Sequence, residues 1–556
     1  MKKTSTLPSC LLLALGLSWV NPASTQAQNG PTSTIASFDK SLVNWYNLSP
    51  EVEQVQGVSV NRVYQELLPT RTPKRKTVVA VIDSGIDILH EDLQGRIWTN
   101  PKEVAGNGLD DDANGYIDDL HGWGFLGNAK GEDIKFETYE FVRILRKLAP
   151  TYSQYTSLQK VPTAKQAEYK QYAAAKKAFD EELAKQQKNK QSLMEFNQVL
   201  GKVEGIIAQH LDKKDFTLAE LKAITAANED VLRARAWLIG RYELGYTPYS
   251  FHHMLEMSDV FLNQHLNLSY DPRSTIIGDN PEDIQDRRYG NNNVTGLRPD
   301  HGTPVAGVIA GVRNNQIGID GIAQDVEIMV LRAVPQGDER DKDIALAIRY
   351  AVDNGAHIIN MSFGKSFSAQ KSLVDEATAY AESKNVLIVH AAGNDASNID
   401  EAANFPSKKR SNGTLASNWL EVGANARLLD ENLCGEFSNY GKLTVDLFAP
   451  GVEIISLAPG NQYNKMDGTS FASPVVSGVA ALVWAYYPEL TAVELKEVLL
   501  ASTVQHPKQK VYQPNLASAN KRKIAFAALS KTGGIVNAYQ AMLLAEKKAA
   551  EKGVKN

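Results

Sequence analysis

Short apolar runs rich in β-branched residues alternate along the chain with amphipathic helical patterns. The runs lie at 77–82, 326–331, 357–361 and 386–389, and helical spacing is found over 344–352 and 372–383. A strand that is apolar at every position is typical of one buried on both faces of a parallel sheet. Strands that alternate with helices therefore predict an α/β fold with a mostly parallel central sheet.

Between residues 133 and 285 the pattern changes to helical spacing alone. Residues 163–200 contain neither Gly nor Pro and carry apolar side chains at helical intervals, which predicts one long amphipathic helix. A further helix is predicted to begin at Thr217, where Glu220 completes a capping box. We expect residues 133–285 to form a large α-helical insertion in the α/β domain.

The first residues have the pattern of a targeting segment. Two lysines precede an apolar run over 11–20, and small residues follow. This pattern predicts a cleaved secretory signal over 1–27, because the run is too short to span a bilayer. A lipoprotein signal at Cys10 is not favoured, since the apolar run follows that cysteine. We expect export to the periplasm or the cell exterior, and no integral membrane segment after cleavage.

The remaining boundaries follow from these patterns. They predict an N-terminal extension over 28–76, the two parts of the α/β domain over 77–132 and 286–505, and a helical tail over 506–556.

Composition narrows the classes of function. The chain has 556 residues, 43% hydrophobic and 22% charged, which excludes whole-chain disorder. A net charge of −5 argues against a nucleic-acid partner or an anionic membrane surface. The two cysteines are Cys10 and Cys434, so removal of the signal leaves no intrachain disulfide and no Cys-rich metal site.

Three short segments carry candidate chemistry. They contain Asp83 before Ser-Gly, His301 before Gly-Thr, and Ser470 after Gly-Thr. Each is weak alone, because Asp-Ser-Gly also turns a chain and a serine at a helix start is often only a cap. Together they supply a nucleophilic hydroxyl, a base to take its proton, and a carboxylate to orient that base.

The order Asp, His, Ser and these local sequences resemble the subtilisin-like serine proteases, or subtilases (peptidase family S8). The resemblance implies a three-layer subtilisin-like fold and hydrolysis of peptide bonds through an acyl-enzyme intermediate. It implies that Asp83 orients the base, that His301 is the general base and then acid, and that Ser470 is the nucleophile. Pro304 departs from the family, which more often has a second histidine there, but this position is outside the triad.

The same resemblance assigns two further features. Asn394, after Gly393, matches the side chain that donates to the oxyanion, with the backbone N–H of Ser470 as the second donor. The substrate-binding strand is implied to be Ser362, Phe363 and Gly364.

The family also implies a structural calcium site. Asp92 matches its carboxylate ligand, and Asn315 matches the side chain of the loop that completes it. Hard oxygen donors of this kind suit calcium, although asparagine-rich turns are often only turns.

A second acidic segment resembles an EF-hand loop. Asp110, Asp112, Asn114 and Asp118 stand at its ligand positions, but the final position is His121 and not glutamate. Asp119 or a distant carboxylate would have to replace that ligand; otherwise the segment is a solvated acidic turn. Three consecutive aspartates at 110–112 are costly without a cation, which favours a bound ion.

Two other functions compete with a protease. An inactive subtilase that acts as a binding protein would be free to lose Ser470, His301 or Asn394, and all are present. An esterase of the α/β-hydrolase type would show Gly-x-Ser-x-Gly and the order Ser, Asp, His, and the chain has neither. We therefore predict a serine endopeptidase with protein or peptide substrates and no organic cofactor. Its insertion is either a lid over the substrate cleft or a surface decoration.

Overall fold

A computed structural model of the chain describes residues 34–225, 227–516 and 522–553. The predicted signal over 1–27, with Cys10, lies outside the described residues.

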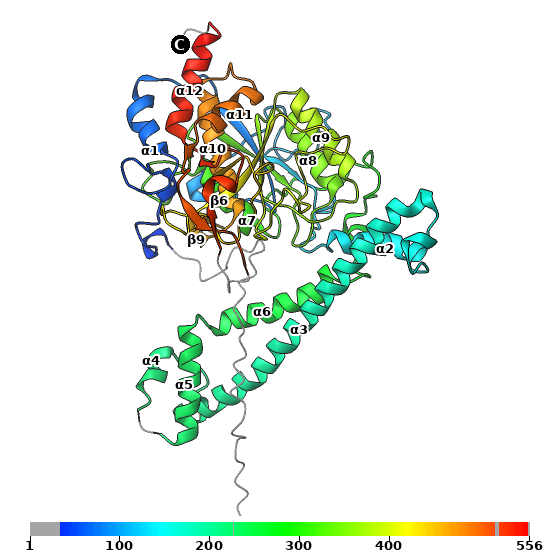
Figure 1. Cartoon of the computed structure of the whole chain (residues 1–556), viewed down its shortest axis with the longest axis vertical. Coiled ribbons are helices and arrows are strands. Elements are labelled where there is room, and N and C mark those ends of the chain that lie inside the picture. Colours follow the sequence, from blue (N-terminus) through cyan, green and yellow to red (C-terminus); the bar gives the residue numbers. More distant parts are fainter. Residues whose placement is uncertain (1–33, 226, 517–521, 554–556) are drawn as a thin grey trace, which may run out of the picture.

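A sheet forms the centre of the body of the protein (Figure 1). It has nine strands in the order β10-β13-β7-β6-β5-β4-β1-β3-β2. Every pairing in it is parallel except the one between β10 and β13. The four predicted runs correspond to β1, β3, β4 and β5. The nine strands are β1 (Thr77–Asp83), β2 (Gly122–Gly124), β3 (Val326–Arg332), β4 (Ile358–Met361), β5 (Leu387–Ala391), β6 (Trp419–Asn425), β7 (Leu447–Pro450), β10 (Val504–Gln505) and β13 (Gly534–Ile535).

Helices cover both faces of this sheet, which makes three layers. One face packs against α7 (Pro299–Ala310), α10 (Thr469–Tyr486), α11 (Ala492–Ala501) and α12 (Ala538–Glu551), and the other against α8 (Asp341–Asp353) and α9 (Lys371–Ser383). Strand β1 shows why its run is apolar throughout: Val79 and Val81 enter one core, and Ala80 and Ile82 enter the other. The expectation of a mostly parallel α/β sheet is confirmed.

Helix α10 crosses the middle of the first core. In the described part of the chain it alone is long and apolar enough to span a membrane, and all of its residues are buried inside the protein. Its apolar character is that of a core helix.

The N-terminal extension is built into the same core. It forms η1 (Ile35–Ser37), η2 (Trp45–Asn47), α1 (Val60–Arg62), η3 (Val63–Leu67) and η4 (Leu68–Thr70). Trp45 and Tyr46 are fully buried, and the Tyr46 hydroxyl donates to the backbone oxygen of Asp320 at 3.0 Å. Burial of such large aromatic side chains stabilises the attachment of this segment to the domain.

The stretch predicted as an insertion forms a helical arm that projects from the body (Figure 1). It contains α2 (Glu140–Tyr152), η6 (Leu158–Lys160), η7 (Thr163–Lys165), α3 (Gln166–Leu211), α4 (Leu218–Ala223), α5 (Glu229–Glu243), α6 (Pro248–Val260), η8 (Phe261–His265) and η9 (Arg273–Ile277). The long predicted helix is α3, with 46 residues, and the predicted capping box of Thr217 and Glu220 is present.

Two separate apolar clusters stabilise the arm. The proximal cluster joins α2 to the start of α3 around Tyr152 and Tyr172. The distal cluster joins the end of α3 to α4, α5 and α6 around Phe196 and Leu238. Each half therefore has its own small core.

The C-terminal region differs from the predicted helical tail. Before α12 it contains β11 (Lys510–Tyr512), β12 (Lys523–Ala525), η10 (Phe526–Ala528) and β13, which joins the central sheet. Val511 and Ile535 are buried in an apolar cluster with Phe448 of β7. Strands of two or three residues are too short to show a period of two in the sequence, which is why helical patterning dominated the prediction. The remaining elements are η5 (Glu91–Leu93) and the hairpin β8 (Ile454–Ala458) and β9 (Gln462–Met466).

Candidate active site

The carboxyl end of β1 and the first turn of α7 bring Asp83 and His301 together. His301 Nδ1 lies 2.8 Å from Asp83 Oδ1. The close approach depends on Gly302, because a Cβ there would lie 2.3 Å from the backbone oxygen of Gly85. Gly85 itself has a φ of +124°, a conformation that favours glycine. Two residues next to the candidate triad are thus glycines for steric reasons.

His301 is buried, with 8% of its surface exposed. Burial lowers its pKa, but the charge of Asp83 and the hydrogen bond to it outweigh that effect, so the pKa is raised above its ordinary value of 6.5. Its Nε2 atom has no hydrogen-bond partner among the described residues. Because Asp83 occupies Nδ1, Nε2 is the nitrogen left to exchange a proton.

Ser470 lies in the first turn of α10, one residue before Phe471, whose ring approaches that of His301. The rings of His301 and Phe471, the next residue after Ser470, have centroids 6.0 Å apart. Ser470 Oγ donates to the backbone oxygen of Ser362 at 3.1 Å and, among the described residues, makes no hydrogen bond with His301. In enzymes that use a serine and a histidine as nucleophile and base, the hydrogen bond between them is often formed fully only when substrate is bound.

Asn394 follows the end of β5 and is fixed by the residue before Ser470. Its Oδ1 accepts hydrogen bonds from the backbone N–H and the hydroxyl of Thr469, each at 2.9 Å. Thr469 Oγ1 also accepts from the backbone N–H of Gly393 at 3.1 Å. These bonds leave the Nδ2 amide of Asn394 as a donor that binds none of the described residues. The motif Gly-Thr-Ser contains Thr469, but its orienting role was not predicted.

The predicted substrate strand follows β4 and is tied to α10. Ser362 Oγ donates to the backbone oxygen of Ser470 at 2.9 Å. The backbone oxygen of Phe363 lies 2.8 Å from Nε2 of the buried His390, and His390 Nδ1 lies 2.9 Å from Glu421 Oε1. The backbone of the predicted substrate strand is therefore held by the buried side chain of His390, which the sequence analysis did not single out.

Gly364 is the exposed residue of this strand. It lies between Phe363 and Lys365, which are both buried. Lys365 exchanges two backbone hydrogen bonds of 2.9 Å with Phe405. Among the described residues, the backbone of Gly364 makes no hydrogen bond. It is accessible to an extended chain that would pair with it, as in strand addition to a sheet edge.

The structure brings the predicted calcium ligands Asp92 and Asn315 into contact. The contact is a hydrogen bond in which the amide of Asn315 donates to the carboxylate of Asp92. Asn315 Nδ2 donates to Asp92 Oδ1 at 2.6 Å, and the backbone N–H of Ile319 donates to Asp92 Oδ2 at 2.9 Å. The Oδ1 of Asn315 accepts from the backbone of Ile317. Both oxygens of Asp92 accept N–H groups, and among the described residues the pair offers a single carboxylate and no orphaned buried oxygen, which supports a cation site less well than a cluster of carboxylates does.

The acidic loop, residues 110–118, is a better candidate for a cation site. Carboxylate oxygens of Glu103, Asp110 and Asp112 lie within 4.8 Å of one another. Glu103 is 8% exposed, and its Oε2 is buried without a hydrogen-bond partner among the described residues. Burial raises the pKa of Glu103. Three clustered carboxylates, one of which has an orphaned buried oxygen, fit a bound cation.

The other two predicted ligands of this loop, the side chains of Asn114 and Asp118, make hydrogen bonds with groups outside the cluster of Glu103, Asp110 and Asp112. Asp118 accepts from the backbone N–H groups of Asn107 and Gly108, and Asn114 donates to Asp119 at 2.9 Å. Glu103 is a candidate for the further carboxylate that the loop pattern lacks. Its position seven residues before the loop gave no signal in the sequence.

Comparisons with known proteins point to one family. The family model described as Subtilase family matches residues 74–527. Thermophilic serine proteinase of Bacillus sp. (strain AK1) is 41% identical over 186 residues, which are 33% of this chain and 42% of that protein. Alkaline elastase YaB of Bacillus sp. (strain YaB) is 37% identical over 201 residues, 36% of this chain and 48% of that protein.

Subtilisin BL of Lederbergia lenta is 33% identical over 221 residues, which are 39% of this chain and 76% of that protein. The matches thus span a little under half the length of the first two relatives and about three quarters of the third. Since the family model covers most of the sequence, from the residues before β1 to η10, the chain belongs to the subtilase family.

Proposed function

We propose that the protein is a serine endopeptidase in which Asp83, His301 and Ser470 form the catalytic triad. The observation that carries this proposal is the 2.8 Å contact of Asp83 with His301, which leaves His301 Nε2 unpartnered beside the first turn of α10. Orientation of a base by a buried carboxylate is the arrangement that acyl transfer to a serine requires.

In the proposed reaction His301 Nε2 takes the proton of Ser470 Oγ as this oxygen attacks the peptide carbonyl. Asp83 stabilises the imidazolium that results, and His301 then gives the proton to the leaving amine. A water molecule hydrolyses the acyl-enzyme with His301 again as the base. For the first step the Ser470 hydroxyl must turn from Ser362 toward His301.

The developing oxyanion is proposed to bind two donors. One is Asn394 Nδ2, and the other is the backbone N–H of Ser470 at the positive end of α10. The two hydrogen bonds from Thr469 to Asn394 Oδ1 support this role, because they fix the orientation of the side-chain amide and leave Nδ2 as a donor without a partner in the described part of the chain. A preorganised donor needs no reorientation when the charge develops.

The proposed substrate is a protein or peptide chain in extended conformation. Its backbone would pair with the exposed Gly364, whose neighbours Phe363 and Lys365 are held in place. Pairing through backbone groups places the scissile carbonyl near Ser470 without requiring one particular side chain.

We also propose a structural calcium at the acidic loop, held by Glu103, Asp110 and Asp112. A bound Ca²⁺ would neutralise these carboxylates and rigidify the loop before β2. The cluster of three carboxylates and the orphaned Glu103 oxygen support this site. Asp92 and Asn315 are not included, because among the described residues this pair brings a single carboxylate and no orphaned buried oxygen.

The site of action is proposed to lie outside the cytoplasm, in the periplasm or the cell exterior. The support is the charge and hydrophobicity pattern of residues 1–27.

Reaction with a biotinylated fluorophosphonate tests the proposed function. Peptide mapping of the labelled protein should find the adduct on Ser470 and no adduct after substitution of His301 by alanine. Labelling of another serine, or labelling that does not depend on His301, would contradict the assignment.

A further inference from the structure

Lys365, directly after the predicted substrate strand, has its ammonium buried among acceptors from two other segments. Its side chain is 1% exposed. Lys365 Nζ lies 2.9 Å from Glu140 Oε2, 2.9 Å from Asp341 Oδ1 and 2.8 Å from the backbone oxygen of Glu339. Burial of an ammonium group is tolerated only with such paired and hydrogen-bonded partners. Lys365 thus links the substrate strand to α2 of the insertion and to α8.

Arg143 clamps the first turn of α2 onto the loop before α8. Its guanidinium donates to the backbone oxygens of Asp338 and Glu339, each at 3.0 Å, and to the carboxylate of Glu140. The insertion and the loop therefore share both side-chain and backbone groups. Because Glu140 bonds to Arg143 and Lys365 together, it is the central anion of this junction.

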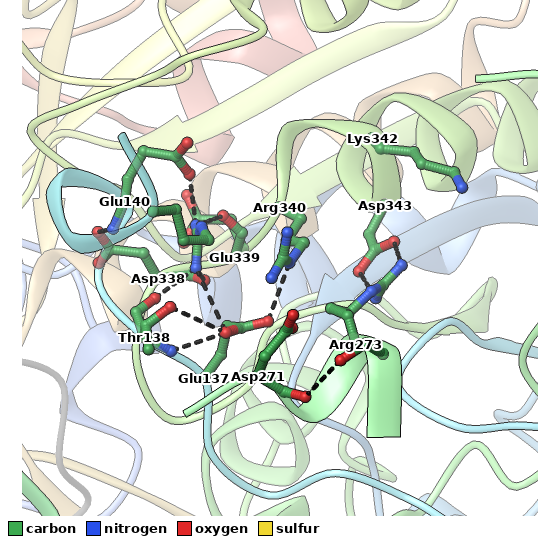
Figure 2. Close-up of polar contacts among 12 residues, drawn as sticks. Glu137, Thr138, Glu140, Asp271, Arg273, Asp338, Glu339, Arg340, Lys342 and Asp343 are labelled. Atoms are coloured by element: carbon green, nitrogen blue, oxygen red, sulfur yellow. Dashed lines mark hydrogen bonds and ion pairs between the residues drawn. The ribbon is translucent and has the colours of Figure 1, made fainter. Parts of the chain in front are cut away.

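Further contacts join the start of the insertion, at Glu137 and Glu140, to the loop before α8 (Figure 2). The backbone N–H of Glu140 donates to Asp338 Oδ2 at 2.7 Å, and Arg340 Nε donates to Glu137 Oε2 at 2.9 Å. The backbone N–H of Glu137 also donates to the oxygen of Gln336 at 2.8 Å. The start of the insertion is fixed to this loop by main-chain and side-chain bonds.

The charges of the central pair are strongly stabilised. Burial alone would raise the pKa of Glu140, but Arg143 and Lys365 lower it to about 2. Burial opposes the charge of Lys365 as well, but Glu140, Asp341 and Glu339 raise its pKa above the ordinary value. The pair is ionised at neutral pH, and loss of one partner leaves the other as an uncompensated buried charge.

We propose that Glu140 and Lys365 are positioning residues for substrate binding, so that helix α2 of the insertion supports the predicted substrate strand. This proposal rests on the proposed peptidase function. Gly364 is exposed between Phe363, held by His390, and Lys365, held by Glu140. A shift of Lys365 would carry the Gly364 backbone with it, and strand pairing depends on that position.

The test compares Glu140→Gln and Lys365→Met with Asp279→Asn as a matched control. Asp279 forms an equally buried ion pair with Lys342 at 2.8 Å, at the other end of the insertion and without contact to the substrate strand. The KM for a long peptide should rise about tenfold in the first two variants, with the kcat for a small ester and the rate of fluorophosphonate labelling within about twofold of wild type. In the double variant the two effects should add incompletely, because both substitutions remove the Glu140–Lys365 ion pair.

An unchanged KM in Glu140→Gln and Lys365→Met would overturn the proposal. So would an equal rise of KM in Asp279→Asn at a matched loss of melting temperature, because that result indicates only general destabilisation. If Glu140→Gln does not fold, Asp341→Asn removes a different carboxylate from the same ammonium and is judged by the same criteria. Absence of labelling in the wild type would contradict the proposed function instead, so the two failures are distinguishable.

Discussion

Asp83 Oδ1 accepts a hydrogen bond from His301 Nδ1 at 2.8 Å, across the junction of β1 and α7. The two residues are 218 positions apart in sequence, and the whole helical arm lies between them. The insertion has therefore left the contact between carboxylate and imidazole intact. This contact determines both the tautomer of His301 and the direction of its pKa shift.

The pH dependence of activity should follow His301. Because Asp83 raises the pKa of His301 above 6.5, a base that must be neutral becomes active only as the pH rises through that higher value. The acidic limb of the profile of kcat/KM should therefore have an apparent pKa above 6.5. Asp83→Asn should lower kcat by about 10⁴-fold, because it removes the charge and favours the wrong tautomer. A limb centred below 6.5 would contradict this role of Asp83.

Substitution of Asn394 should affect turnover and not binding. Asn394→Ala should lower kcat about 10² to 10³-fold with little change in KM, because the amide donates to charge that develops only in the transition state. Thr469→Val, which removes one of the two bonds to Asn394 Oδ1, should lower kcat less. Steady-state kinetics on one peptide amide compares the two, and a rise in KM with unchanged kcat would argue against an oxyanion role.

Calcium should stabilise the fold more than it accelerates the reaction. A ligand that binds only the folded state adds RT ln(1 + [L]/Kd) to the free energy of unfolding. The melting temperature should fall after chelation by EDTA and recover with Ca²⁺. Glu103→Gln should abolish most of this shift, and Asp92→Asn should retain it. A melting temperature unaffected by thorough chelation would exclude a calcium site at the acidic loop.

Deletion of the distal part of the helical arm distinguishes the two interpretations of the insertion, a lid over the substrate cleft and a surface decoration. Replacement of residues 193–255 by a short Gly/Ser bridge removes the distal cluster but keeps α2 and its contacts with Lys365. If the arm restricts access, cleavage of folded proteins should rise much more than cleavage of a small peptide amide. An unchanged ratio of the two rates in a well-folded variant would identify the arm as a decoration.

The sequence was sufficient for the sheet core and for the local motifs. Strand β1 is buried on both faces, so its apolar composition alone identifies it as a strand. Asp83 is its last residue. The sequence was not sufficient where tertiary contacts bring in a side chain from outside a motif. Glu103 approaches the acidic loop from seven residues before it, and nothing in its local pattern distinguishes it from a solvated glutamate.

Two other features escaped prediction for related physical reasons. Lys365 has the appearance of a surface lysine, and only its contact with Glu140, 225 positions away, shows that it is buried. Strand β13 has two residues, and its neighbours in the central sheet come from distant parts of the chain. Tertiary packing and not local propensity determines both.

The central claim is that Ser470 is the nucleophile of a peptidase. Ser470→Ala retains the backbone N–H and removes only the hydroxyl that lies 3.1 Å from the oxygen of Ser362, so the fold should be preserved. The most direct measurement is hydrolysis of a fluorogenic peptide by wild type and by Ser470→Ala, at matched concentration of folded protein. The account predicts a loss of turnover on the order of 10⁶-fold with an unchanged melting temperature. Equal hydrolysis by the two proteins would contradict it.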